Sequence, residues 1–193
     1  LEGGHDQALV LGAGRVGFYA ALYLAARGAA RRIVLADAQP GRARRAAEYL
    51  SRWYPEVGLE AGDLRELAQE WSFVVTATDS REPVYQARRN PAPVVVSLGA
   101  DTAWRRELPL SLAGSWPVYV DSVDALRTGD LKHWRSRGLM RPGDLVDLVA
   151  LVREGSKPPG EDPVVFVATG SPLLDNLTVG YLMQALEADE ASA

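Results

Sequence analysis

A short apolar run that opens into a glycine-rich turn constrains this chain more than any other feature. Residues 8–17 read ALVLGAGRVG, and they contain the pattern G-x-G-x-x-G. A buried strand that leads through this pattern into a helix is typical of dinucleotide-binding domains. Gly12 permits the tight turn, Gly14 lets backbone amides approach a pyrophosphate, and Gly17 lets the helix lie close to the strand. The predicted cofactor-binding residues in this loop are Gly12, Ala13, Gly14, Arg15, Val16 and Gly17.

An acidic residue at the end of the second predicted strand supports this interpretation. A helical run over residues 18–27 is followed by the strand 32–37, RIVLAD. Asp37 lies 20 residues after Gly17, a position from which a carboxylate accepts hydrogen bonds from the hydroxyls of an adenosine ribose. Because this carboxylate would repel a 2′-phosphate, the sequence favours NAD over NADP as the cofactor.

Two alternatives for this region stay open. Asp37 is also placed to cap the helix that begins near Pro40. Arg42, Arg44 and Arg45 follow closely and offer a phosphate a guanidinium fork, so NADP remains possible.

Composition narrows the classes of protein that fit. With 193 residues and 47% hydrophobic content, the chain can bury one sizeable core, which predicts one domain. The net charge of −4 and the absence of a basic stretch argue against nucleic-acid binding. No apolar run approaches the roughly 20 residues that span a bilayer, and no leader is evident, so we expect a soluble cytoplasmic protein.

Residue types that form disulfides, metal sites or nucleophilic catalytic triads are scarce in this chain. The chain has no cysteine, which excludes disulfides and thiolate nucleophiles. His5 and His133 are the only histidines, too few for a histidine metal cluster or a persuasive triad. We therefore predict no metal site, and we interpret His133 as a helix surface residue.

The remaining chain alternates between apolar strands and helical patterns. Strands are predicted at 57–61, 73–78, 93–98, 117–121 and 164–168, and helices at 41–53, 63–71, 145–152 and 172–187. Strands separated by helices predict an α/β fold: a Rossmann-like, doubly wound, mostly parallel sheet with helices on both faces. We expect residues 1–7 to be a linker or a cloning scar, 8–187 the single dinucleotide-binding domain and 188–193 a tail.

Polar residues end the strand at 73–78. Ligands of open parallel sheets lie beyond the carboxyl ends of the strands, so Thr76, Thr78 and Asp79 are placed on the ligand side. The alternative is that they only end the strand and cap the next segment. Asp130 is predicted to cap the helix that contains His133. Asp175 is predicted in the first turn of the last helix, where the helix dipole explains it.

Five segments in order resemble the NAD(P)-binding domain of the ornithine cyclodeaminase/mu-crystallin family. They are GAGRVG at 12–17, VVTATDSREPV at 74–84, SLGADTAWRRELP at 97–109, VDSVDALRTGDL at 120–131 and FVATGSPLLDN at 166–176. Members of this family carry out redox chemistry at the α-carbon of amino or imino acids, and mu-crystallin also binds thyroid hormone.

The resemblance implies roles for two further segments. Thr76, Ala77 and Thr78 would lie along the cofactor near its nicotinamide half. Gly99 and Ala100 would also contact the cofactor, and Asp101 would be the catalytic acid that moves a proton at the substrate nitrogen or at an attacking water. Hydride transfer at an amine carbon requires such a partner group.

Two departures from the family pattern limit what this chain is expected to do alone. Family enzymes have an N-terminal region of roughly domain size that contacts the substrate carboxylate and forms the dimer, whereas only residues 1–11 precede Gly12 here. The Gly-Arg found before the last strand in the family is Gly160-Glu161 here.

Two functions are therefore expected from the sequence. The first is an oxidoreductase or cyclodeaminase component that depends on another chain, a missing region or a second protomer for its amino or imino acid substrate. The second is a stand-alone NAD-binding or sensing module without turnover. A methyltransferase shares the glycine loop and the acid, but the segment TATDSREP argues against it.

Overall fold

The computed structural model describes residues 5–64, 67–154 and 163–190. Their elements follow in order: β1 (His5–Leu11), α1 (Arg15–Ala26), β2 (Ala30–Ala36), α2 (Pro40–Trp53), β3 (Gly58–Ala61), β4 (Phe73–Thr76), β5 (Val94–Ser97), η1 (Leu110–Leu112), β6 (Val118–Val120), η2 (Val123–Arg127), α3 (Gly129–Ser136), η3 (Pro142–Asp144), β7 (Leu145–Asp147), α4 (Leu148–Glu154), β8 (Val164–Val167) and α5 (Pro172–Glu190). The η elements are short 3-10 helices.

All strands join one parallel sheet in the order β3-β2-β1-β4-β5-β8-β6-β7. The chain builds outward from β1 to β3 and then returns to place β4 on the other side of β1. This reversal leaves a crevice beyond the carboxyl ends of β1 and β4, which is where open α/β sheets bind ligands. The predicted Rossmann-like fold is confirmed.

Two hydrophobic clusters cover the two faces of the sheet. On one face, α1 and α2 pack small and branched side chains, such as Ala21 and Leu50, against Val10 and Ile33. On the other face, Trp134 of α3 belongs to a cluster of buried residues that extends from β1 to β8. Because both faces are covered, the strands are continuous apolar runs instead of alternating ones.

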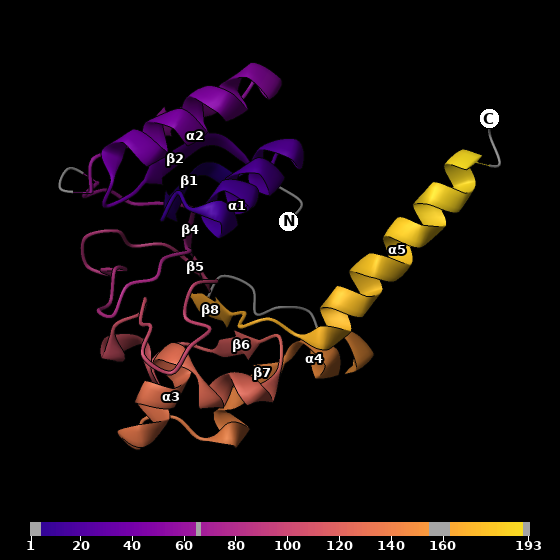
Figure 1. Cartoon of the computed structure of the whole chain (residues 1–193). Coiled ribbons are helices and arrows are strands. Elements are labelled where there is room, and N and C mark those ends of the chain that lie inside the picture. Colours follow the sequence, from indigo (N-terminus) through magenta and orange to yellow (C-terminus); the bar gives the residue numbers. More distant parts are fainter. Residues whose placement is uncertain (1–4, 65–66, 155–162, 191–193) are drawn as a thin grey trace.

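Figure 1 shows that α5 leaves the body of the molecule and points away from the sheet. Its exposed apolar side chains include Leu177 and Tyr181, which are 61% and 71% exposed. None of the helices within the described residues is both long and apolar enough to cross a lipid bilayer.

Several predicted boundaries were wrong. β1 begins at His5, which pairs with Ala30, so the strand starts inside the segment 1–7 that was predicted as a linker; residues 1–4 lie outside the described residues. The described residues of the predicted helix 63–71 are not helical. The predicted helix 145–152 begins as β7, because Leu145 pairs with Val118 of β6.

The expected alternation of strands and helices was also too regular. The described chain between β4 and β5 contains no helix, and only the single turn η1 lies between β5 and β6. These long connections instead bury Tyr85 and Leu108 on the sheet, so tertiary packing replaces local helical structure. Gly160 and Glu161 lie outside the described residues.

The two outer glycines of the loop are required by close packing. Gly12 has φ +98°, and a Cβ there would overlap the carbonyl of Ala77; a Cβ on Gly17 would overlap the carbonyl oxygen of Gly12. A Cβ on Gly14 would meet nothing within 4 Å. The roles predicted for Gly12 and Gly17 therefore follow from contacts between α1, β1 and the residues after β4.

These contacts predict opposite results for two matched substitutions. Gly17→Ala should lower the free energy of unfolding by about 3 kcal/mol, because the added methyl forces α1 away from the turn. Gly14→Ala should change it by no more than about 1 kcal/mol, since its Cβ enters open space. Urea unfolding of both variants measures the difference, and equal stabilities would show that the close approach at Gly17 is not a constraint.

Candidate functional site

A cavity of ≈ 680 Å³ lies along the carboxyl edge of the sheet. Its size falls within the range of small-molecule and cofactor sites. Nine of the residues predicted from sequence line it: Gly12, Gly14, Arg15, Val16, Asp37, Ala77, Thr78, Gly99 and Asp101. Because Asp37 follows β2 and Asp101 follows β5, the cavity extends across the crevice at the reversal of strand order.

The N-terminus of α1 opens onto this cavity. Gly14 is the N-cap residue, and within the described part of the chain no side chain caps this helix and no acid stands in its first turn. The first amides of a helix have no partner within it and carry a partial positive charge. An open N-terminus of a 12-residue helix, with space where a Cβ of Gly14 would lie, fits a bound anion such as a pyrophosphate.

Asp37 ties the end of β2 to the glycine loop. Its Oδ2 accepts a hydrogen bond from the Ala13 amide at 2.8 Å, and its Oδ1 accepts one from the Gln39 amide at 2.8 Å. Arg42 Nη1 lies 3.6 Å from Oδ2, and the Asp37 side chain is 8% exposed. The contact with the Gln39 amide is a local turn two residues along the chain. Gln39, and not Asp37, is the N-cap residue of α2, so the capping alternative is not supported. The carboxylate keeps further lone pairs for a ribose.

Four predicted residues lie behind the cavity wall. Thr76 is fully buried, and its hydroxyl donates to Glu107 instead of facing the cavity. Ala13 contributes its amide to Asp37, Gly17 packs on the turn, and Ala100 is 1% exposed. These residues support the wall, so a direct contact between the Thr76 side chain and a cofactor does not follow from this geometry.

Asp101 lies at the opposite side of the cavity from Asp37. Its Oδ1 accepts a hydrogen bond from Arg105 Nη1 at 2.7 Å, and the two side chains are 47% and 32% exposed. Both residues line the cavity. The predicted catalytic acid is therefore accessible and paired with a guanidinium that the sequence analysis did not assign.

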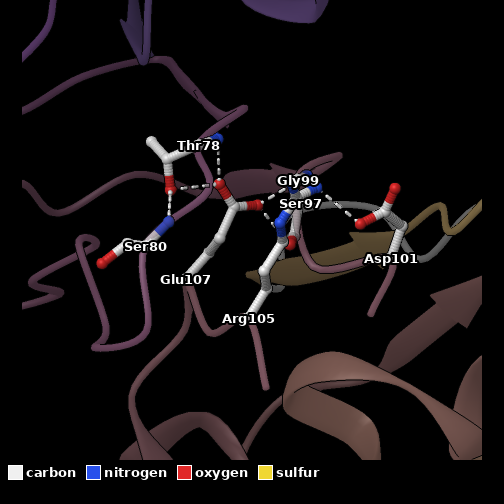
Figure 2. Close-up of polar contacts among 7 residues, drawn as sticks. All are labelled: Thr78, Ser80, Ser97, Gly99, Asp101, Arg105 and Glu107. Carbon is white, nitrogen blue, oxygen red and sulfur yellow. Dashed lines mark hydrogen bonds and ion pairs between the residues drawn. The ribbon is translucent and has the colours of Figure 1, made fainter. Parts of the chain in front are cut away.

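The residue that organises this side of the cavity is Glu107, which was not predicted. Figure 2 shows its carboxylate between Thr78 on one side and Ser97 and Gly99 on the other. Oε1 accepts from the Thr78 amide at 2.5 Å and from Thr78 Oγ1 at 2.9 Å. Oε2 accepts at 2.8 Å from Thr76 Oγ1, from Ser97 Oγ and from the Gly99 amide.

Glu107 thus joins the ends of β4 and β5 through five donors while its side chain is fully buried. No local pattern reveals this role, because Glu107 sits in an irregular segment between two charged arginines and a leucine. The segment SLGADTAWRRELP did contain it, but only the fold brings residue 107 beneath residues 76–78.

Asp130 supports Glu107 from behind. The Glu107 amide donates to both Asp130 oxygens, at 3.1 and 3.0 Å. Burial raises the pKa of Asp130 to about 7, and the amides of Glu107 and Leu108 oppose that rise. The prediction that Asp130 caps this helix was wrong: Thr128 is the N-cap residue of α3 and Asp130 lies in its first turn. The Asp130 carboxyl instead holds the backbone of the segment that carries Glu107.

His133 lies outside the cavity, as its interpretation as a helix surface residue implies. Its Nε2 is 3.5 Å from Arg106 Nη1. The pKa of His133 is lowered, chiefly by partial burial and then by the positive charges of Arg106 and Arg137.

No family model and no curated protein sequence matches the chain. Solved structures do match. The iminosuccinate reductase of Paracoccus denitrificans in complex with NAD+ has a TM-score of 0.77 at 21% identity, with 97% of this chain and 58% of that chain covered. A probable ornithine cyclodeaminase from Bordetella pertussis Tohama I has a TM-score of 0.77 at 24% identity, with coverages of 97% and 61%.

A third structure extends the likeness. The Thermococcus litoralis Δ1-pyrroline-2-carboxylate reductase in complex with NADH and L-proline has a TM-score of 0.72 at 20% identity, and 86% of this chain covers 53% of that chain. These likenesses show the fold, and they agree with the resemblance that the sequence motifs indicate. This chain spans between 53% and 61% of the length of these three solved chains.

The buried carboxyl of Asp130 predicts a pH dependence of stability. The folded chain raises its pKa from 3.8 to about 7, so the folded state retains a proton that the unfolded state releases. Asp130 therefore contributes stability that is fully present below about pH 4 and is lost as the pH rises through about 7. At about 1.4 kcal/mol per unit of pKa difference, the wild-type chain should lose a few kcal/mol more than Asp130→Asn across this range.

Urea unfolding at a series of pH values measures this difference. Asp124→Asn, at an exposed carboxylate, controls for the loss of one negative charge and should keep the wild-type pH dependence. Parallel pH curves for the wild type and Asp130→Asn would contradict the assignment.

Proposed function

We propose that this chain is a nicotinamide-dinucleotide-binding domain of the ornithine cyclodeaminase type, with NAD as its cofactor. The observation that carries the proposal is the uncapped N-terminus of α1, which opens onto the cavity at Gly14. The glycine loop and α1 amides would hold the pyrophosphate, and Asp37 the adenosine ribose. Two structures of similar fold are complexes with NAD+ and with NADH.

NAD is favoured over NADP by the position of Asp37. Its carboxylate lines the cavity beyond β2, where it accepts hydrogen bonds from ribose hydroxyls and repels a 2′-phosphate. Arg42 lies 3.6 Å from this carboxylate and so is partly neutralised by it. NADP binding would require Arg42 to leave Asp37 for the phosphate, and this is the alternative that the experiment distinguishes.

Thermal unfolding of the chain with NAD, NADP or S-adenosylmethionine tests the cofactor. At a concentration of about 100 times Kd, NAD should stabilise the folded state by about 2.7 kcal/mol and raise Tm by roughly 5–10 °C. Gly14→Ala should lose most of this shift, because its methyl fills the space beside the α1 amides. Gly180→Ala, on α5 and also in open space, is the matched control and should keep it.

Two results would contradict the proposal. Stabilisation by neither nicotinamide dinucleotide would remove NAD binding, and stabilisation by S-adenosylmethionine alone would indicate a methyltransferase instead. A larger shift with NADP than with NAD would reverse the assigned preference.

The chemistry that this site supports best is redox at the α-carbon of an amino or imino acid. A bound nicotinamide accepts or donates the hydride. Asp101, which is accessible in the cavity and paired with Arg105, would take up or return the proton at the substrate nitrogen or at a water. The pairing with Arg105 also orients the carboxylate before a substrate arrives.

We further propose that substrate binding depends on a region or chain that completes this site. The chain spans little more than half of the solved chains of similar fold, and α5 projects from the body with Leu177 and Tyr181 exposed. A helix with several exposed apolar side chains is typical of a surface that a partner covers. A companion region, a second protomer or a separate subunit fits this surface; the second candidate function is NAD binding or sensing without turnover.

Turnover assays distinguish these two functions. The chain alone should bind NAD but should not reduce it with L-proline, L-ornithine or L-lysine, because a cleft open to water weakens positioning and electrostatic stabilisation. Steady reduction by the chain alone would contradict this expectation. In that case Asp101→Asn should abolish turnover and leave the NAD-induced rise in Tm unchanged. If Asp101→Asn kept both the turnover and the rise in Tm, Asp101 would be excluded as the catalytic acid.

A further inference from the structure

Glu107 carries a buried negative charge that its hydrogen bonds stabilise but do not cancel. All five of its side-chain contacts are with neutral donors: two backbone amides and three hydroxyl interactions. Among the described residues, no lysine or arginine forms an ion pair with it. Neutral dipoles lower the energy of a buried carboxylate, yet its net charge still acts on its surroundings.

This charge lies directly behind the cavity wall. Thr78 and Gly99 line the cavity, and each donates its amide to the Glu107 carboxylate. The carboxylate is thus one hydrogen bond away from the surface that a ligand would contact. The side chain is fully buried, so water screens its charge less than that of an exposed acid.

Other charged groups near this wall do not supply the same unpaired negative charge. Asp101 and Arg105 face the cavity but are paired with each other at 2.7 Å, so their fields largely offset one another. Asp130 accepts from the backbone amide of Glu107, and neither the Thr78 amide nor the Gly99 amide is bonded to it; both donate to Glu107. Asp79 also lines the cavity, next to Thr78, but its side chain is exposed to water. Glu107 is the buried acid that accepts hydrogen bonds from both the Thr78 and the Gly99 amide.

We infer that Glu107 makes the site select the oxidised cofactor, whose nicotinamide ring is cationic, over the reduced cofactor, whose ring is neutral. This inference rests on the proposed function, and it assigns Glu107 as a specificity-determining residue that acts through the wall. The two forms of the cofactor share their adenosine and pyrophosphate, so the ring charge is the main electrostatic difference between them. A unit charge this close to the wall changes the affinity for a cation by roughly ten-fold.

Binding to the full 193-residue chain tests the inference without any turnover. Isothermal titration gives Kd for NAD+, NADH and ADP-ribose, the last of which lacks the nicotinamide. The wild-type chain should bind NAD+ roughly ten-fold more tightly than NADH. In Glu107→Gln this ratio should fall toward one, while the Kd of ADP-ribose stays unchanged.

Ser97→Ala is the matched control. It removes one of the hydroxyls that donate to Oε2 and leaves the carboxylate in place, so the NAD+ to NADH ratio should stay at its wild-type value. If Glu107 had a purely structural role, Glu107→Gln would instead bind all three ligands more weakly by a similar factor.

Each outcome decides the matter. A wild-type chain that binds NADH as tightly as NAD+, or an unchanged ratio in Glu107→Gln, overturns the inference and leaves the proposed function standing. If Glu107→Gln does not fold, the wild-type ratio alone makes the decision. Failure of the wild-type chain to bind any of the three ligands overturns the proposed function, and the inference with it.

Discussion

The carboxyl edge of this sheet depends on carboxylates that accept hydrogen bonds from the amides just beyond the strands. Those amides have left the ladder and need acceptors. Asp37 joins the ends of β2 and β1 through Ala13, and Glu107 joins β4 and β5 through Thr78 and Gly99. Asp121, after β6, accepts from the Thr169 and Gly170 amides beyond β8, at 3.0 and 2.8 Å. Each acid thus bridges the ends of two adjacent strands, and the first two hold the part of the edge that forms the cavity.

The crevice between β1 and β4 is held by a different contact. There the backbone of Gly12 and the α1 residue Gly17 approach each other and the Ala77 carbonyl so closely that neither glycine accepts a side chain. Backbone packing closes this part of the sheet without an acid, and it leaves the first α1 amides free of side-chain caps within the described chain. The N-terminus of α1, which can receive an anion, is therefore the part of this edge where no carboxylate among the described residues caps the amides.

Burying a carboxylate without a cation is costly unless donors surround it. Glu107 meets that requirement with five hydrogen bonds from residues of two strand ends, and Asp130 holds the backbone of the same segment. The arrangement ties the ends of β4 and β5 together, and it places this carboxylate behind the part of the cavity wall that Thr78 and Gly99 form. One side chain thus supports the wall and is the source of the proposed preference for the oxidised cofactor.

The sequence alone determined the features that depend on local pattern: the apolar strands, the glycine turn, the acid after β2 and the parallel Rossmann-like sheet. It misplaced the first strand and the segment 145–147, and it wrongly predicted a helix at 63–71. These predictions failed because strand pairing and burial against distant residues override local helical spacing. Only the tertiary structure decided that Thr76 turns to Glu107, that Asp101 pairs with Arg105, and that Asp130 supports a loop. Hydrogen bonds such as that between Thr76 and Glu107, which are 31 positions apart, leave no periodic signal in the chain, since they exist only after the strands have paired.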